Sequence, residues 1–157
     1  MPKRFTNKVV IVTGAASGLA RATALAFAGE GARLTLVDIN GAGLDETAAE
    51  AQAAGAEVLA IATDVSARAA CVEIVAQTIT RFGQLDVLCN IAGIVQIGHV
   101  ADVSEADWQR MVAINLSAPF WLSQAALPHL ISSRGNIVNC ASQSSVKGSA
   151  YVVPYSM

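Results

Sequence analysis

The sequence predicts one α/β domain over residues 1–157, built as a doubly wound parallel sheet with helices on both faces. Short, continuous apolar runs rich in β-branched residues alternate with helical stretches along the whole chain. Continuous runs, in contrast to strict alternation, are typical of strands buried on both faces of a parallel sheet. The repeated strand–helix order implies right-handed crossovers and three layers, α/β/α. No linker, low-complexity tract or repeat divides the 157 residues.

Five apolar runs are the expected strands, and each ends in turn residues. They span residues 8–14, 33–38, 57–64, 85–93 and 135–142. The expected helices lie between them, over residues 18–31, 41–55, 66–83 and about 104–133.

Local signals mark the ends of the first three helices. Gly31, Gly55 and Gly83 stand where these helices stop, and glycine is the residue most often found just past a helix C-terminus. Ser66 precedes the third helix and is its expected N-cap, because a serine oxygen can accept a free N–H of the first turn.

The last helical segment carries three further signals. Ser104, followed by Asp107 three residues later, resembles a capping box in its acidic form. Pro119 lies inside the segment and is expected to kink it, because proline lacks the N–H of a helical hydrogen bond. Asn115 is a poor helix former four residues before Pro119. Its simplest role is to pair with a carbonyl that the kink loosens.

Composition excludes several classes of partner. Apolar residues make up 54% of the chain, above the roughly 45–50% of ordinary domains, so the chain needs a sheet covered on both faces or a subunit interface. A net charge of −2 provides no basic surface for nucleic acid or anionic lipid. No run reaches the ~18 apolar residues of a membrane span, and the polar start is too short for a secretory signal.

Cysteine usage favours a reducing compartment. Cys71, Cys89 and Cys140 are far apart and form no C-x-x-C pair, so neither a zinc site nor a disulfide framework is expected. We interpret them as reduced cysteines packed as small hydrophobic residues in the cytoplasm.

A glycine-rich turn follows the first strand. The stretch "TGAASGLA", residues 13–20, joins that strand to the first helix. Glycines let backbone approach backbone or phosphate, and the helix N-terminus offers free N–H groups and positive dipole to a pyrophosphate. Asp38 ends the second strand, twenty residues after Gly18, where an acid can accept the ribose hydroxyls of an adenosine. The combination predicts a dinucleotide site; the alternative is a structural turn beside a solvated aspartate.

Asp38 also predicts which dinucleotide binds. Its negative charge would repel the 2′-phosphate of NADP(H). The next residue is Ile39, and not a basic residue that could bind this phosphate. Arg21 and Arg33 are the nearest cations in the sequence, but Arg33 begins its strand and is expected to point away. NAD(H) is therefore favoured over NADP(H).

At this point the sequence resembles the short-chain dehydrogenase/reductase family, whose domain has the Rossmann-type fold. "TGAASGLA" is similar to that family's T-G-x-x-x-G-x-G, with Ala20 in place of the last glycine. "TDV" at 63–65, "CNIAG" at 89–93, "INLSAPF" from 114 and "IVNCAS" at 137–142 match further motifs in the family's order. The resemblance extends from about Asn7 to the end of the chain.

The resemblance implies a set of cofactor contacts. By it, NAD is held by Gly14, Ser17, Gly18, Leu19, Asp38, Asp64, Val65, Asn90, Ala92 and Gly93. Structural alternatives stay open: Asp64 as a cap after the third strand, and Asn90 and Gly93 as ordinary turn residues. Their position after strands favours the cofactor, because open α/β sheets bind ligands at that edge.

The resemblance also implies the catalytic residues. In the family a tyrosine hydroxyl transfers the proton and a serine hydroxyl donates to the substrate oxygen. Ser142 and Tyr155 have the family's separation, whereas Ser144 and Ser145 lie outside the "NCAS" register and Tyr151 is too close to Ser142. We interpret Tyr151 as an exposed loop or substrate-pocket residue.

Two further roles follow from the resemblance. Asn115 would hold a water of the proton relay. A lysine four residues after the tyrosine would lower its pKa, which is near 10 in isolation. That position is 159, and the sequence ends at 157. We therefore expect the C-terminal strands to be missing from these 157 residues, and a polypeptide limited to them to be inactive, aggregating or bound to a partner.

The predicted function is hydride transfer between NAD(H) and a secondary alcohol or ketone. By resemblance the enzyme is a homo-oligomer, a tetramer or dimer. No metal site is expected. One alternative is a non-catalytic NAD-binding protein that regulates or pairs with another subunit. A sugar epimerase is another, but "TGAASGLA" lacks the T-G-x-x-G-x-x-G turn more common there. The sequence does not identify the substrate.

Overall fold

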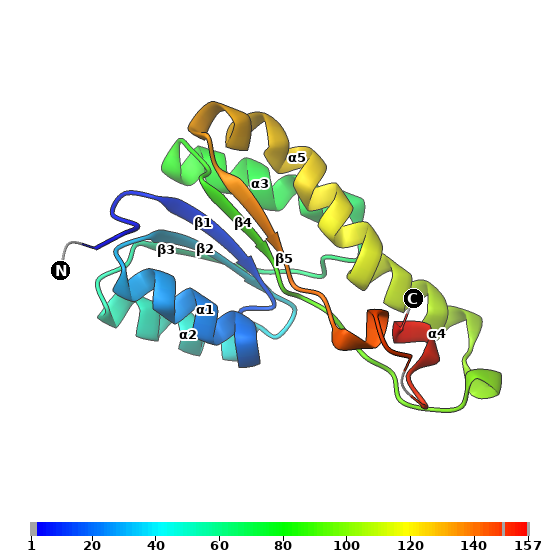
Figure 1. Cartoon of the computed structure of the whole chain (residues 1–157). Coiled ribbons are helices and arrows are strands. Elements are labelled where there is room, and N and C mark those ends of the chain that lie inside the picture. Colours follow the sequence, from blue (N-terminus) through cyan, green and yellow to red (C-terminus); the bar gives the residue numbers. More distant parts are fainter. Residues whose placement is uncertain (1–2, 149, 157) are drawn as a thin grey trace.

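The computed structural model describes residues 3–148 and 150–156 and contains a five-stranded parallel sheet of order β3-β2-β1-β4-β5. The strands are β1 (Val9–Thr13), β2 (Arg33–Asp38), β3 (Val58–Ala62), β4 (Val87–Asn90) and β5 (Asn136–Asn139). One face of the sheet is covered by α1 (Gly18–Gly29) and α2 (Gly41–Ala53), and the other by α3 (Arg68–Phe82) and α5 (Ala118–Ser133) (Figure 1). The predicted doubly wound, three-layer fold is confirmed.

The strand order reverses direction between β1 and β4. β1 pairs with β2 on one side and with β4 on the other, all in parallel. The loops that leave β1 and β4 therefore diverge to opposite faces of the sheet, and the crevice between them is where open α/β sheets bind ligands. In Figure 1 these loops and the C-terminal segment all lie at the arrowhead end of the strands.

Each face of the sheet has its own apolar core. On the first, Ala20, Ala24 and Ala28 of α1 are buried at one-turn spacing, and their small side chains allow the helix to approach the sheet closely. On the second, larger residues of α3 and α5 such as Ile74 and Leu122 fill the layer. The central strands β1, β2 and β4 are thus buried on both sides, as the sequence predicts, whereas the edge strands β3 and β5 are only partly covered.

The glycine signals at helix ends are confirmed, whereas the predicted cap at Ser66 is wrong. Gly31, Gly55 and Gly83 all have positive φ, the conformation that ends a helix. α3 begins at Arg68 and its N-cap position is Ala67. Ser66 lies in the preceding turn, because its backbone N–H is donated to Asp64 Oδ1 at 2.9 Å.

The last helical segment is divided by a π-helical turn. It consists of α4 (Glu105–Val112), the π-turn η2 (Ala113–Ser117) and α5. Ser104 caps α4 as predicted, since its Oγ accepts the N–H of Asp107 at 3.1 Å. The irregularity lies one turn before Pro119, which occupies the second position of α5, where its missing N–H is tolerated.

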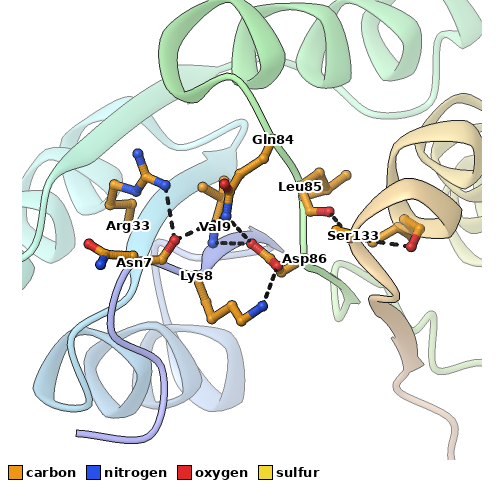
Figure 2. Close-up of polar contacts among 9 residues, drawn as sticks. Asn7, Lys8, Val9, Arg33, Gln84, Leu85, Asp86 and Ser133 are labelled. Atoms are coloured by element: carbon orange, nitrogen blue, oxygen red, sulfur yellow. Dashed lines mark hydrogen bonds and ion pairs between the residues drawn. The ribbon is translucent and has the colours of Figure 1, made fainter.

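A buried carboxylate joins the start of β1 to the loop before β4 at the amino edge of the sheet, opposite the edge where the loops after β1 and β4 lie (Figure 2). Asp86 accepts hydrogen bonds from Lys8 Nζ at 2.8 Å, the Val9 N–H at 2.9 Å and Gln84 Nε2 at 2.7 Å. Burial opposes ionisation of Asp86, but these three donors together hold its pKa below the usual value.

Arg33 donates to the Asn7 carbonyl at 2.9 Å, so it does point away from Asp38 as predicted.

The cysteines differ in environment. Cys71 and Cys89 are buried, and burial raises the pKa of each thiol to about 11. They behave as small hydrophobic residues, as predicted. Cys140 is exposed, which corrects the prediction, because it follows the edge strand β5. Among the described residues no metal-binding group of His, Cys, Asp and Glu occurs, and none of their helices is long and apolar enough to span a membrane.

Candidate active site

Two adjoining clefts lie at the carboxyl edge of the sheet and share Ala92 and Gly93. The β2-side cleft is lined by Gly14, Val37, Asp38, Ile39, Thr63, Asp64, Val65, Ala92, Gly93, Ile94, Arg110 and Ile114. The β5-side cleft is lined by Asn90, Ile91, Ala92, Gly93, Asn115, Leu116, Pro119, Asn139, Cys140, Ala141, Ser142, Ser145 and Tyr155. Ten of the thirteen site residues predicted from the sequence line one cleft or both.

The glycine turn holds β1 close to the loop after β4. Gly14 has φ +78°, and a Cβ there would lie 3.0 Å from Ala92 Cα. Only glycine accommodates both the left-handed backbone and this close approach. The Gly14 N–H donates to the Val37 carbonyl at 2.8 Å, which ties the turn to the neighbouring strand.

Thr13, at the end of β1, also holds the loop after β4 in place. This role was not predicted from the sequence. The buried Oγ1 of Thr13 accepts the N–H groups of Ile91 and Ala92 at 3.0 and 3.1 Å. The signal was present, because a threonine ends an otherwise apolar strand in "TGAASGLA".

The remaining predicted turn residues surround the N-terminus of α1. Ser17, Gly18 and Leu19 are exposed and line neither cleft. Gly18 has φ +56°, and no other atom lies within 4 Å of where its Cβ would be. The start of α1 is therefore exposed and has no side-chain cap from Ser17, as an anion site requires. Ala20 is buried in the core, so the departure from the family's glycine is accommodated.

Asp38 is fixed by two backbone amides. Its Oδ2 accepts the Ala16 N–H at 3.0 Å and its Oδ1 accepts the Asn40 N–H at 2.8 Å. A carboxylate has about four acceptor positions, so both oxygens can still accept hydroxyl donors. Arg21 pairs with Glu50 at 2.5 Å. Like Arg33, which donates to Asn7, it already has a partner of its own.

The cation of the β2-side cleft is Arg110, which our sequence analysis did not consider. Its Nη1 lies 3.8 Å from Asp64 Oδ2. The hydrogen bond that the Ser66 N–H donates to Asp64 lowers the pKa of this carboxyl, and the charge of Arg110 lowers it to a smaller extent. Val65 beside it is buried.

Asn90 lies beneath the β5-side cleft. Its Nδ2 donates to Asn139 Oδ1 on the neighbouring strand at 2.9 Å. Its Oδ1 is buried and has no hydrogen-bond partner among the described residues. Asn90 therefore joins β4 to β5 and leaves one acceptor at the floor of the cleft.

Asn115 holds the loop after β4. Its Nδ2 donates to the Ile94 carbonyl at 2.8 Å, and its Oδ1 accepts the Ile94 N–H at 2.9 Å. The side chain thus pairs with a distant loop and not with a loosened carbonyl of its own helix. The π-turn that contains Asn115 places Ile114 in the β2-side cleft and Asn115 in the β5-side cleft, and such turns often occur at functional sites.

Ser142 and Tyr155 line the same cleft. Ser142 caps the 3₁₀ turn η3 (Gln143–Ser145), and its Oγ accepts the Ser144 N–H at 3.2 Å. Tyr155 ends the 3₁₀ turn η4 (Val153–Tyr155) and is half-buried. Of the competing serines, Ser145 lines the cleft, but its hydroxyl donates to the Ser142 carbonyl at 2.6 Å.

Tyr151 lies outside both clefts, on an exposed loop. Its φ is +64° and its ring is half exposed, 5.0 Å from the ring of His99. The Gly98 N–H donates to the Tyr151 carbonyl at 2.8 Å. This tyrosine joins the loop after β4 to the loop after β5.

Known proteins share this fold and sequence. The sequence model of the short chain dehydrogenase family matches residues 8–157. A (2S)-[(R)-hydroxy(phenyl)methyl]succinyl-CoA dehydrogenase subunit of Thauera aromatica is 39% identical over 151 residues, which are 96% of this chain and 60% of that protein. The meso-2,3-butanediol dehydrogenase of Serratia marcescens is 37% identical over 145 residues, or 92% of this chain and 57% of that protein.

A solved structure agrees with these relatives. A crystal structure of NAD⁺-bound xylitol dehydrogenase superposes with a TM-score of 0.92 at 33% identity, covering 98% of this chain and 60% of that one. The chain spans 57–60% of the length of the two curated relatives named above. With the family match extending over almost all of its residues, the chain belongs to the short-chain dehydrogenase family.

Proposed function

We propose that the protein catalyses hydride transfer between NAD(H) and a secondary alcohol or ketone. One observation carries the proposal: the cleft with Asp38 and the cleft with Ser142 and Tyr155 meet at Ala92 and Gly93. A dinucleotide whose adenosine end lies in the first cleft would place its other end in the second. Relatives named as dehydrogenases of butanediol and xylitol support the alcohol as substrate.

The residues present fit such a cofactor. The exposed N-terminus of α1 would face the pyrophosphate and the Asp38 carboxylate would accept the ribose hydroxyls. The proposed contacts are the ten predicted from the sequence: Gly14, Ser17, Gly18, Leu19, Asp38, Asp64, Val65, Asn90, Ala92 and Gly93. Asn90 is buried but lines the floor of the β5-side cleft.

NAD(H), when bound, would supply or accept the hydride, and side chains of this protein would transfer the proton. The Tyr155 hydroxyl transfers a proton to or from the substrate oxygen, and Ser142 Oγ donates a hydrogen bond to that oxygen. A tyrosine needs a nearby cation to ionise at neutral pH. No Lys or Arg lines the β5-side cleft within the described residues; a bound NAD⁺ would itself bring a positive charge to this cleft.

Asn115 has two parts in this proposal. Its carboxamide positions Ile94 and hence the loop between the clefts. Its carbonyl would normally accept the N–H four residues later, which is Pro119 and has none. That carbonyl is where we place the water of the proton relay.

We further propose a homo-oligomer in the cytoplasm. Leu116, Phe120, Leu127 and Ile131 are exposed at helical spacing along η2 and α5. An apolar stripe of this kind suits burial against a second copy of the chain.

Asp38→Asn tests the choice of cofactor. The substitution removes the charge that repels a 2′-phosphate but keeps an acceptor for a backbone amide. The ratio of kcat/KM for NAD to that for NADP is expected to fall by about tenfold or more, since a like-charge pair costs on the order of 1–4 kcal/mol. The exposed Asp45 of α2 provides the control, and Asp45→Asn should leave the ratio unchanged.

The measurement uses the protein expressed from its complete gene and a panel of secondary alcohols, followed by NADH absorbance. A wild-type protein that uses NADP as well as NAD contradicts the assignment of Asp38. Absence of oxidation of every alcohol contradicts the proposed function as a whole.

A further inference from the structure

Arg110 is the one cation among the described residues that line the β2-side cleft. It comes from α4, which lies at the carboxyl end of the sheet (Figure 1). The buried Met111 packs α4 against the rest of the domain. Ile114 follows Arg110 by about one turn and lines the same cleft, so this helix face is directed at the cleft.

The guanidinium of Arg110 has no hydrogen bond among the described residues. Its approach to Asp64 Oδ2, 3.8 Å, is too long for one. Other arginines are engaged: Arg68, for example, stacks on the Trp121 ring with its guanidinium carbon 4.6 Å from the centroid. Arg110 is therefore a planar cation that faces the cleft, with Asp64 as its ion-pair partner and with no hydrogen bond to fix the guanidinium.

The chemistry of the cleft favours a neutral planar group as its ligand. Asp38 and Asp64 place two carboxylates there against one guanidinium, which disfavours an anion. Val65 and Ile114 contribute buried apolar surface. A guanidinium stacks on aromatic faces, and Asp64 can accept from an exocyclic amine.

We infer that Arg110 binds the adenine base of the dinucleotide, with its guanidinium stacked on the base beside Asp64. This inference rests on the proposed function. It adds to the cofactor site a residue from α4, a helix that also contacts η4, where Tyr155 lies.

The test compares three probes on the protein expressed from its complete gene: NADH, AMP and reduced nicotinamide mononucleotide, titrated by fluorescence or calorimetry. AMP carries the adenine base with its ribose and phosphate but no nicotinamide, and the mononucleotide lacks the adenosine. Arg110→Ala is expected to raise the Kd of NADH and of AMP by about tenfold, the effect of a partly desolvated cation–π contact. The Kd of the mononucleotide should not change.

Two further variants separate stacking from charge and from folding. Arg110→Lys keeps the charge but not the planar group and is expected to lose most of the affinity for AMP. Arg81→Ala is the matched control: Arg81 has the same side-chain exposure of 53% and pairs with Glu57 at 3.5 Å, away from the clefts. It should bind all three probes like the wild type. If Arg110→Ala does not fold, Arg110→Gln, which retains the stem, takes its place.

Unchanged AMP binding in Arg110→Ala would overturn the inference, as would an equal loss of the mononucleotide or full affinity in Arg110→Lys. In each case NADH binding by the wild type would leave the proposed function standing. A wild type that binds neither NADH nor AMP would overturn the proposed function and this inference with it.

Discussion

Tyr155→Phe is expected to lower kcat for alcohol oxidation by about 10²–10⁴-fold, the usual contribution of a positioned proton-transfer group. The substitution removes only the hydroxyl, so the cleft keeps its shape and its apolar contacts. The Kd of NADH should therefore stay within about twofold of the wild-type value, because the loss concerns the transition state and not ground-state binding. Steady-state kinetics and NADH titration of the protein expressed from its complete gene measure both quantities.

Tyr151→Phe is the matched control for this prediction. Tyr151 is four residues away but lies outside both clefts, and its carbonyl, not its hydroxyl, accepts from Gly98. Its kcat should be close to that of the wild type. If Tyr155→Phe kept more than a tenth of the activity, or if Tyr151→Phe lost as much, Tyr155 would not be the proton-transfer residue.

Gly135→Ala is expected to destabilise the fold by about 3 kcal/mol, the upper range for overpacking a tight site. A Cβ at Gly135 would overlap the carbonyl oxygen of Asp86 and lie 2.8 Å from its carbonyl carbon and 2.9 Å from Leu130 Cδ2. Because most of these atoms are backbone, relief requires moving β5 away from β4. That movement would also stretch the hydrogen bond, 3.0 Å long, that the Asn136 N–H donates to the Asp86 carbonyl.

The measurement is denaturant unfolding, with Gly29→Ala as the control. Gly29 ends α1, and no atom lies within 4 Å of where its Cβ would be. Its replacement should leave the free energy of unfolding unchanged or raise it by up to about 1 kcal/mol, because alanine loses less backbone entropy. Equal stability of the two variants would show that β4 and β5 do not approach as closely as the structure has them.

The parts of the site that the sequence predicts are those built from local segments. The glycine turn, Asp38 and the strand ends depend on spacing within one βα unit, and the structure brings them to one edge. Ser142 and Tyr155 were assigned by resemblance to the family, whose serine–tyrosine separation they match, and they line one cleft.

The parts that the sequence does not predict depend on contacts between distant segments. Arg110 resembles any solvated arginine on an amphipathic helix, and only the packing of α4 places it beside Asp64. The pairing of Asn115 with Ile94 likewise arises from tertiary structure. Ser66 does not cap α3 because its N–H donates to the nearby Asp64 carboxylate, which holds Ser66 in the turn before the helix.

The most direct measurement of the central claim is the transfer of deuterium from a secondary alcohol labelled at its carbinol carbon to NAD⁺. The two adjoining clefts predict NADH that carries deuterium at C4 of the nicotinamide, on a single face, with the label absent when Tyr155→Phe replaces the wild type. A protein that binds NADH but transfers no deuterium from any alcohol of a broad panel would contradict the account and indicate a non-catalytic NAD-binding protein on the same fold.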